Sequence, residues 1–198
     1  MQSHSQFARS ILACCLLAAT STLVFSQEAT PAAPAKPAVG TQVPPAQVYD
    51  KVLTIMEQQF VGAAEAMPED KFNFAPQATA GEFKGVRTFA QQLKHVAETN
   101  YYFFGGPDSS DADSKAMADS IEKLTTKADI VKALKDSFAK AHAFVDAMTP
   151  ENAFVMTAHG TRAGMAALGI AHFMDHYGQM VLYLRMNGIV PPASRGSM

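Results

Sequence analysis

Cysteine and tryptophan are the residues that this chain most lacks. It has no tryptophan, and its two cysteines, Cys14 and Cys15, lie in an apolar segment near the N-terminus. If that segment is removed, the remaining chain can form no disulfide and offers neither a thiol nucleophile nor a thiolate metal ligand. A metal site in the remaining chain would therefore have to use histidine, carboxylate or water ligands.

An excess of charge of one sign is also missing. The chain carries 16 Lys and Arg residues against 18 Asp and Glu residues, and no basic patch stands out. Proteins that bind nucleic acid use clustered positive side chains to neutralise phosphates. We therefore expect no nucleic-acid partner.

The N-terminal segment resembles a secretory signal peptide. Arg9 precedes an apolar run from Ile11 to Phe25, and small residues before Gln27 offer a cleavage site. The run is short for a membrane span, so we expect residues 1–26 to be removed and the protein to be exported, periplasmic or secreted, without stable membrane insertion. An uncleaved anchor is the alternative. Residues 27–45 are rich in Ala and Pro, which is typical of a disordered linker.

Residues 46–195 are predicted to form one all-α domain. Apolar residues recur every three or four positions in four long segments, near residues 45–67, 88–104, 126–148 and 161–187. A weaker helical segment lies near residues 114–124, and no strand pattern competes. Four amphipathic helices with short to moderate loops predict an antiparallel four-helix bundle. The apolar face of the first helix is expected to include Val48, Val52, Ile55, Met56, Phe60 and Ala63.

Two histidines on the last predicted helix have the spacing of metal ligands. His172 and His176 lie one helical turn apart, so their side chains share a face and can bind one ion. Phe173 stands where the zinc-protease motif has its glutamate, which excludes that motif. The alternative is a pair of buried imidazoles whose nitrogens are satisfied by hydrogen bonds.

His95 is the candidate for a third ligand. It lies between Leu93 and Val96 on the second predicted helix, on or beside the packed face. Sites in helical bundles are built from side chains of facing helices, so His95 could join His172 and His176. Three imidazoles with positions left for water are typical of a catalytic site rather than a closed structural one. The alternative for His95 is a hydrogen bond to a backbone carbonyl.

The other two histidines of the predicted domain are weaker candidates. His142 borders the apolar face of the third helix, and we interpret it as a partly exposed edge residue. His159 precedes the fourth helix and is interpreted as a loop residue. Either residue could support the site or contact a substrate.

Polar residues near the three histidines could assist them. Glu98 and Asp175 are the nearest carboxylates, but Asp175 is offset from His176 by about 100° around the helix and is interpreted as solvated or ion-paired. Gln179 lies three residues after His176, where it could orient a water or substrate, or tie its helix to a neighbour.

Several segments, in order along the chain, resemble the DinB-like family. They are Phe74-Ala75-Pro76, Arg87-Thr88-Phe89, Leu93 to Glu98, Asn100 to Phe103, His172 to Met180 and Tyr183 to Pro192. The resemblance implies a four-helix bundle, often dimeric, in which three histidines hold a divalent metal. By position these are His95, His172 and His176. We expect Zn or Ni, with Fe, Cu or Mn as alternatives.

The resemblance and the signal peptide together favour an exported metalloenzyme. A few relatives are thiol-dependent transferases, but export would separate this protein from the cytosolic pool of small thiols. We therefore expect a metal-dependent hydrolase or group transferase that acts on an unknown small molecule. The alternatives are a non-catalytic metal- or ligand-binding bundle, or a thiol-dependent S-transferase if the protein is cytosolic. A site sealed by Phe173, Met174 and Tyr102 would favour the non-catalytic alternative.

Overall fold

The computed structural model describes residues 36–77, 81–106 and 109–196, and Ala38–Met198 form a compact unit. The predicted signal peptide and residues 27–35 of the predicted linker lie outside the described residues. Residues 36–44 contain no helix or strand. The remainder of this section concerns the compact unit.

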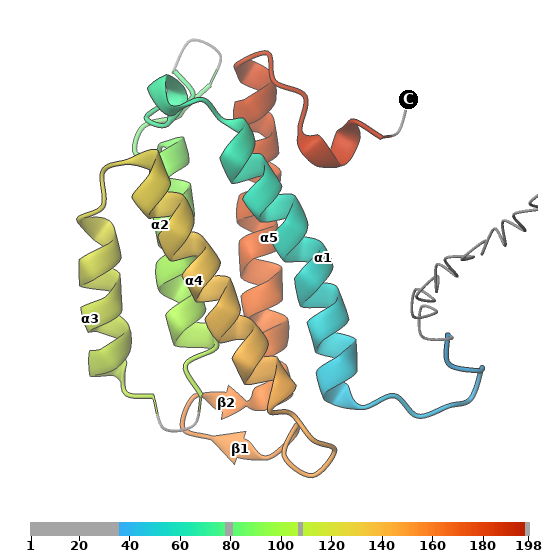
Figure 1. Ribbon diagram of the computed structural model, residues 1–198. Helices are drawn as coiled ribbons and strands as arrows, with labels where there is room; N and C mark the ends of the chain where they lie inside the picture. Colours follow the sequence, from blue (N-terminus) through green and yellow to red (C-terminus); the bar gives the residue numbers. More distant parts are fainter. Residues whose placement is uncertain (1–35, 78–80, 107–108, 197–198) are drawn as a thin grey trace, which may run out of the picture. The chain divides into compact units, whose positions relative to one another are not determined.

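The described part of this unit is mostly helical (Figure 1). Its α-helices are α1 (Pro45–Ala66), α2 (Phe89–Phe103), α3 (Asp111–Glu122), α4 (Lys127–Asp146) and α5 (Arg162–Met186). Short 3-10 turns follow α1 at Glu69–Lys71 and α5 at Pro192–Ser194, and β1 (Met156–Thr157) pairs antiparallel with β2 (Gly160–Thr161). The prediction of an all-α fold is confirmed. The hairpin was not predicted because two-residue strands are too short to show an alternating pattern.

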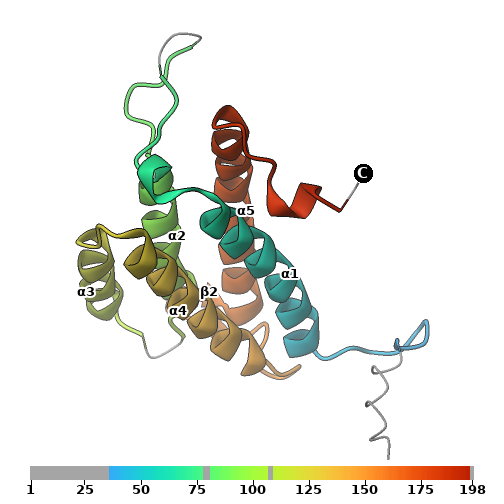
Figure 2. The same ribbon diagram turned by 45° about the horizontal axis from the view of Figure 1, so that its top comes forward.

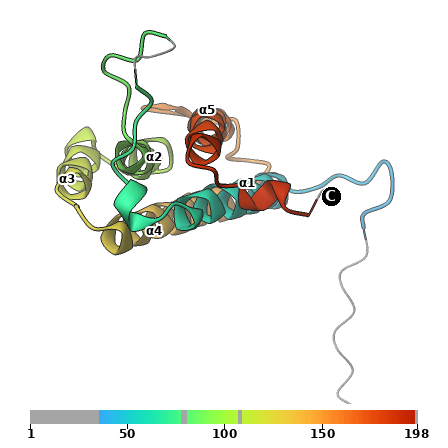
Figure 3. The same cartoon turned by 90° about the horizontal axis from the view of Figure 1, so that it is seen from above.

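The helices pack in two layers with α3 at the side. Helix α1 packs against α4 and α5, whereas α2 packs against α3, α4 and α5. Seen along the helices in Figure 3, α2 and α5 lie in one layer and α1 and α4 in the other. Figure 2 shows α3 on the side of α2 that faces away from α5. The α2–α5 layer contains the three candidate ligands.

Helix directions correct one prediction. Lys127, at the start of α4, donates a hydrogen bond to the Glu65 carbonyl near the end of α1 (2.9 Å), so α1 and α4 are antiparallel. Phe104, just after α2, packs against Phe144 near the end of α4, with ring centroids 5.7 Å apart. The ends of α2 and α4 are therefore close together, so these two helices run in the same direction. A simple antiparallel arrangement is therefore wrong for this pair. The reason is α3, which returns the chain between them (Figure 1).

Aromatic side chains occupy the centre of the core. Phe173 of α5 contacts Phe60 of α1 and Phe138 of α4 edge to face, with centroid separations of 6.4 and 5.3 Å, and all three are fully buried. Gly169 allows the end of α2 to approach α5, because a Cβ there would lie 2.6 Å from the Phe104 ring. Replacing such a buried Phe by Ala typically costs about 3–5 kcal/mol, so this cluster contributes strongly to stability.

The predicted apolar face of α1 is partly wrong. Val48, Val52 and Ile55 are 47%, 38% and 42% exposed, whereas Leu53 is fully buried. Helix α1 packs mainly against α4 and α5, with a smaller contact to the Pro192–Ser194 turn, so its buried face is narrower than the full set of its apolar positions. The exposed residues form one stripe, since they are spaced four and three positions apart.

Local signals start and end the helices. The Thr126 hydroxyl accepts a hydrogen bond from the Asp129 backbone N–H at the start of α4, and Thr161 caps α5 in the same way. Gly188, with φ of +74°, follows α5 in the left-handed conformation that ends many helices. Within the residues that the structure describes, we find no helix with the length and apolar character needed to cross a membrane.

Candidate metal centre

The structure brings His95, His172 and His176 together between α2 and α5. The Nε2 atoms of His95 and His172 are 3.2 Å apart, and those of His172 and His176 are 3.3 Å apart. All three residues offer a nitrogen within 4.8 Å of the other two. Imidazole nitrogens bound at ~2.1 Å to one ion lie roughly 3–4 Å apart, so this spacing suits a single metal ion.

Helix α5 holds two of the rings at the edge of the core. Phe173, between them in sequence, points into the aromatic cluster, so His172 and His176 lie on the adjoining flank toward α2. His176 is buried, and His172 and His95 are half-buried. The cluster is therefore only partly shielded from solvent.

Hydrogen bonds orient two of the rings. The Nδ1 atom of His176 contacts the amide oxygen of Gln92, which can only accept, so this nitrogen carries the proton. The Thr99 hydroxyl donates to the His95 carbonyl (2.8 Å) and therefore accepts from Nδ1–H of His172 (3.3 Å). The Nε2 atoms of His172 and His176 consequently present lone pairs to each other. Such lone pairs repel unless a cation lies between them, so the donor set fits a metal ion.

The three imidazoles are poor proton acceptors. Burial, with a contribution from the Arg87 charge and the other two rings, lowers the pKa of His95 to about 4. Burial and the neighbouring His172 lower the pKa of His176 to about 4, although the Asp175 charge opposes this shift. Burial also lowers the pKa of His172. The neutral rings keep their lone pairs at neutral pH, as metal binding requires.

Two cavities border His95. The larger, of about 530 Å³, lies between α2 and α3 and reaches the β1–β2 turn. Its walls are formed by His95, Glu98, Thr99, Tyr102, Asp111, Ser114, Lys115, Ala118 and His159. The smaller, of about 290 Å³, also contains His95 and Glu98, together with Arg87 and Glu122. His95 therefore connects the cluster to polar cavities.

Glu98 is the carboxyl group that these cavities share with His95. Its pKa is raised to about 7, mainly by burial and then by the negative charge of Glu122, which lies within hydrogen-bonding reach. The positive charges of Lys94 and Arg87 oppose this shift but do not cancel it. A carboxyl with this pKa can both accept and release a proton near neutral pH. Of the two carboxylates predicted to lie near the site, Glu98 is the one with access to the cavities.

The remaining predicted residues lie in different places. Asp175 is exposed and accepts a hydrogen bond from the Gln179 amide nitrogen (3.1 Å), so neither side chain faces the cavities. His159 lies in the β1–β2 turn and lines the larger cavity beside Tyr102, with ring centroids 5.8 Å apart. His142 faces α1 instead of the cluster, and its nitrogens contact Asp50 (2.6 Å) and Glu57 (2.9 Å).

Two partners of the rings, Thr99 and Gln92, were not predicted from the sequence. Thr99 is four residues after His95, a spacing that places it on the same face of α2. Gln92 is three residues before His95, so helical spacing could have flagged both residues. Their contacts with His172 and His176 depend on how α2 and α5 pack, which local periodicity does not specify.

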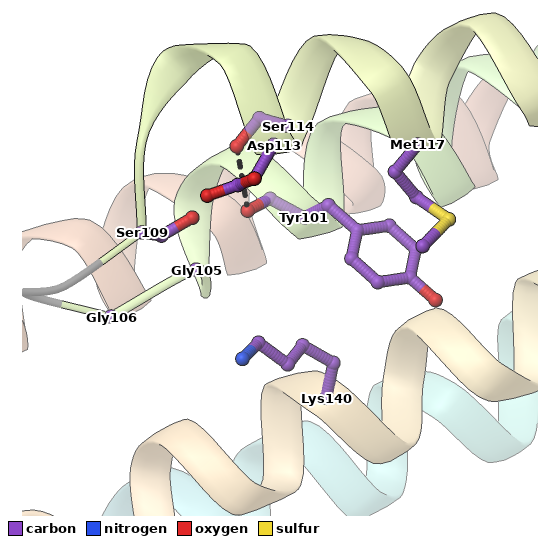
Figure 4. A pocket seen from close by; sticks show the side chains of 8 residues that line it. All are labelled: Tyr101, Gly105, Gly106, Ser109, Asp113, Ser114, Met117 and Lys140. Atoms are coloured by element: carbon purple, nitrogen blue, oxygen red, sulfur yellow. Dashed lines mark hydrogen bonds between the residues drawn. The ribbon is translucent and has the colours of Figure 1, made fainter.

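Another cavity, of about 460 Å³, is separate from the histidines (Figure 4). Its walls are formed by Tyr101, Gly105, Gly106, Ser109, Asp113, Ser114, Met117 and Lys140. Lys140 extends from α4 on one side, while Asp113 and Ser114 lie on α3, where the Ser114 hydroxyl donates to the Tyr101 carbonyl (3.4 Å). This cavity offers no cluster of metal ligands among the residues around it.

The fold and the cluster define a helical protein with a three-histidine site suited to a metal ion. The family model described as the DinB superfamily matches residues 53–180, a segment that contains all three histidines. The chain belongs to the DinB superfamily. A search of curated proteins finds no match. The family assignment agrees with the cluster, since DinB-like proteins bind divalent metals.

Proposed function

We propose that His95, His172 and His176 bind one divalent metal ion and that the protein is a metal-dependent hydrolase or group transferase acting on a small molecule. The observation that carries this proposal is the convergence of their nitrogens, with two Nε2 lone pairs facing each other at 3.3 Å. Zn or Ni is the ion that we expect. When bound, it would polarise a substrate oxygen or lower the pKa of a water molecule.

The surroundings of the cluster favour an enzyme over a non-catalytic site. Phe173 packs into the core and Tyr102 is 47% exposed at the cavity, so neither covers His95. The larger cavity provides space for a small substrate, and the polar side chains of Asp111, Lys115 and His159 line its wall. Glu98 provides the group that accepts or releases a proton.

We further propose that the helices form a four-helix bundle, that the protein is exported and that it forms a homodimer. Helices α1, α2, α4 and α5 would form the four-helix bundle, with α3 outside it. Residues 1–26 would be removed during export, which mass spectrometry of the protein from its host would test by a mature N-terminus near Gln27. The exposed apolar stripe of Val48, Val52 and Ile55 supports a homodimer. Sedimentation of the Val52→Glu variant beside the wild type would test that interface.

Metal analysis of the purified, untagged protein is the direct test. We expect about one ion per chain, because the three nitrogens suit one ion. A screen of ester, amide and phosphoester substrates, with and without chelator, would then identify a reaction. A protein that binds no divalent ion, or activity that persists after His95, His172 and His176 are all changed to Ala, would contradict the proposal.

A further inference from the structure

A row of polar side chains leads from the surface of α5 to the buried ring of His176. The exposed Asp175 accepts a hydrogen bond from the Gln179 amide nitrogen (3.1 Å). The Gln179 amide oxygen accepts one from the Gln92 amide nitrogen (2.8 Å), and the Gln92 oxygen faces Nδ1 of His176. Helix α5 thus contributes both ends of the row, and Gln92 of α2 lies between them.

The row has one direction because a carboxylate can only accept hydrogen bonds. Asp175 therefore requires the NH₂ group of Gln179 to face it, which turns the Gln179 oxygen toward Gln92. The Gln92 NH₂ group must then face Gln179, and its oxygen must face His176. A histidine nitrogen next to an amide oxygen has to donate, so the proton lies on Nδ1 and the lone pair on Nε2.

We propose that Gln92, Gln179 and Asp175 are positioning residues that hold His176 in the tautomer that can bind metal through Nε2. Gln92 is 2% exposed, so water does not readily replace its hydrogen bonds. Without Asp175, both amides could rotate by 180° and present NH₂ to the ring, which would move the proton to Nε2. This inference rests on the proposed metal site, but the tautomer itself exists without a metal.

Two variants separate the effect of the hydrogen-bonded row from the effect of the Asp175 charge. Gln179→Met breaks the row and keeps the carboxylate, whereas Asp175→Asn keeps the shape, removes the charge and introduces a group that donates as well as accepts. Gln58→Met, at an exposed site on α1, and Asp119→Asn, at an exposed site on α3, are matched controls. Both test positions are half-buried or exposed, so the fold should survive, and circular dichroism would verify this.

The experiment combines nitrogen-15 NMR of the histidine rings in the metal-free protein with zinc titration. We expect the wild-type His176 to be protonated on Nδ1, and both test variants to gain the Nε2-protonated form. Zinc affinity should fall roughly 10- to 100-fold in both, as is usual when a partner of a metal-binding histidine is lost, while the controls remain unchanged.

The outcomes distinguish this inference from the proposed function. An unchanged tautomer in both test variants would overturn the positioning role of the row. An affinity loss confined to Asp175→Asn would also overturn it, because the effect would then be due to charge. If the wild-type protein binds no zinc but both variants show the tautomer change, the proposed function is overturned and the positioning role is supported.

Discussion

The imidazoles on the two sides of the helical core meet different partners. Between α2 and α5, His172 and His176 each have a hydroxyl or an amide oxygen at Nδ1, and their Nε2 atoms face other imidazoles. Between α1 and α4, both nitrogens of His142 contact carboxylates, at 2.6 Å from Asp50 and 2.9 Å from Glu57. Both environments are partly buried, so differences in pKa between these imidazoles arise from their partners.

The pKa values follow from these partners. Burial lowers the pKa of each ring in the three-histidine cluster because the charged form loses hydration. Burial also acts to lower the pKa of His142, but its hydrogen bonds to Glu57 and Asp50 and their negative charges raise it overall. The first environment keeps imidazole neutral and available to a metal, and the second favours imidazolium as a link between helices.

Removing a ligand should break this contrast most strongly. We expect His172→Ala or His176→Ala to abolish stoichiometric metal binding and leave the helical fold, because the core is built from the apolar faces of the helices. Metal analysis and circular dichroism would measure both effects, with His159→Ala as a matched control. A global loss of helicity in either variant would instead make the metal a structural element and favour a non-catalytic role.

The second largest effect is expected from lowering the pH, which should act differently on the two environments. In the metal-free protein, the depressed pKa values of about 4 for His95 and His176 contribute stability that is present above pH 6.5 and is lost as the pH falls toward 4. Zinc affinity should likewise persist down to about pH 6 and fall steeply nearer pH 4, since protons and metal compete for the same nitrogens. Zinc titration across this range would measure it. A midpoint near 6.5 would show that the rings are not desolvated.

The hydroxyl partner of His172 should have a smaller effect than a ligand. Thr99→Val keeps the side-chain shape but removes the acceptor for Nδ1–H, so zinc affinity should fall roughly 10-fold. Thr99→Ser should restore it, because serine retains the hydroxyl. Titration calorimetry would compare the three proteins, and an equal affinity for all three would assign no role to this hydrogen bond.

His142 should produce the smallest effect, and one with the opposite pH dependence. Its raised pKa means that its stabilisation is present below pH 6.5 and is lost as the pH rises through the higher folded-state value. His142→Gln should therefore destabilise the protein by about 1 kcal/mol at pH 6 and by less at pH 9, since these side chains are partly exposed. Thermal unfolding at both pH values would show this. A larger loss at pH 9 than at pH 6 would contradict the assignment of imidazolium.

Local periodicity predicted much of this molecule from the sequence. The spacing of His172 and His176 placed them on one face, because helix geometry depends only on neighbouring residues. The same reasoning located the long helices. It placed a weaker helical segment near residues 114–124, where the structure has α3, but it did not predict that α2 and α4 run in the same direction.

Only the tertiary structure decided which side chains meet across helices. The contact of His95 with His172 spans 77 positions and that of His142 with Asp50 spans 92, and no local pattern encodes such distances. The same holds for Gln92 and Gln179, which are ordinary polar residues until α2 and α5 pack together. The sequence by itself determined which histidines are candidate ligands and which helices contain them. Packing determined their tautomers and charges, because partners and burial set both.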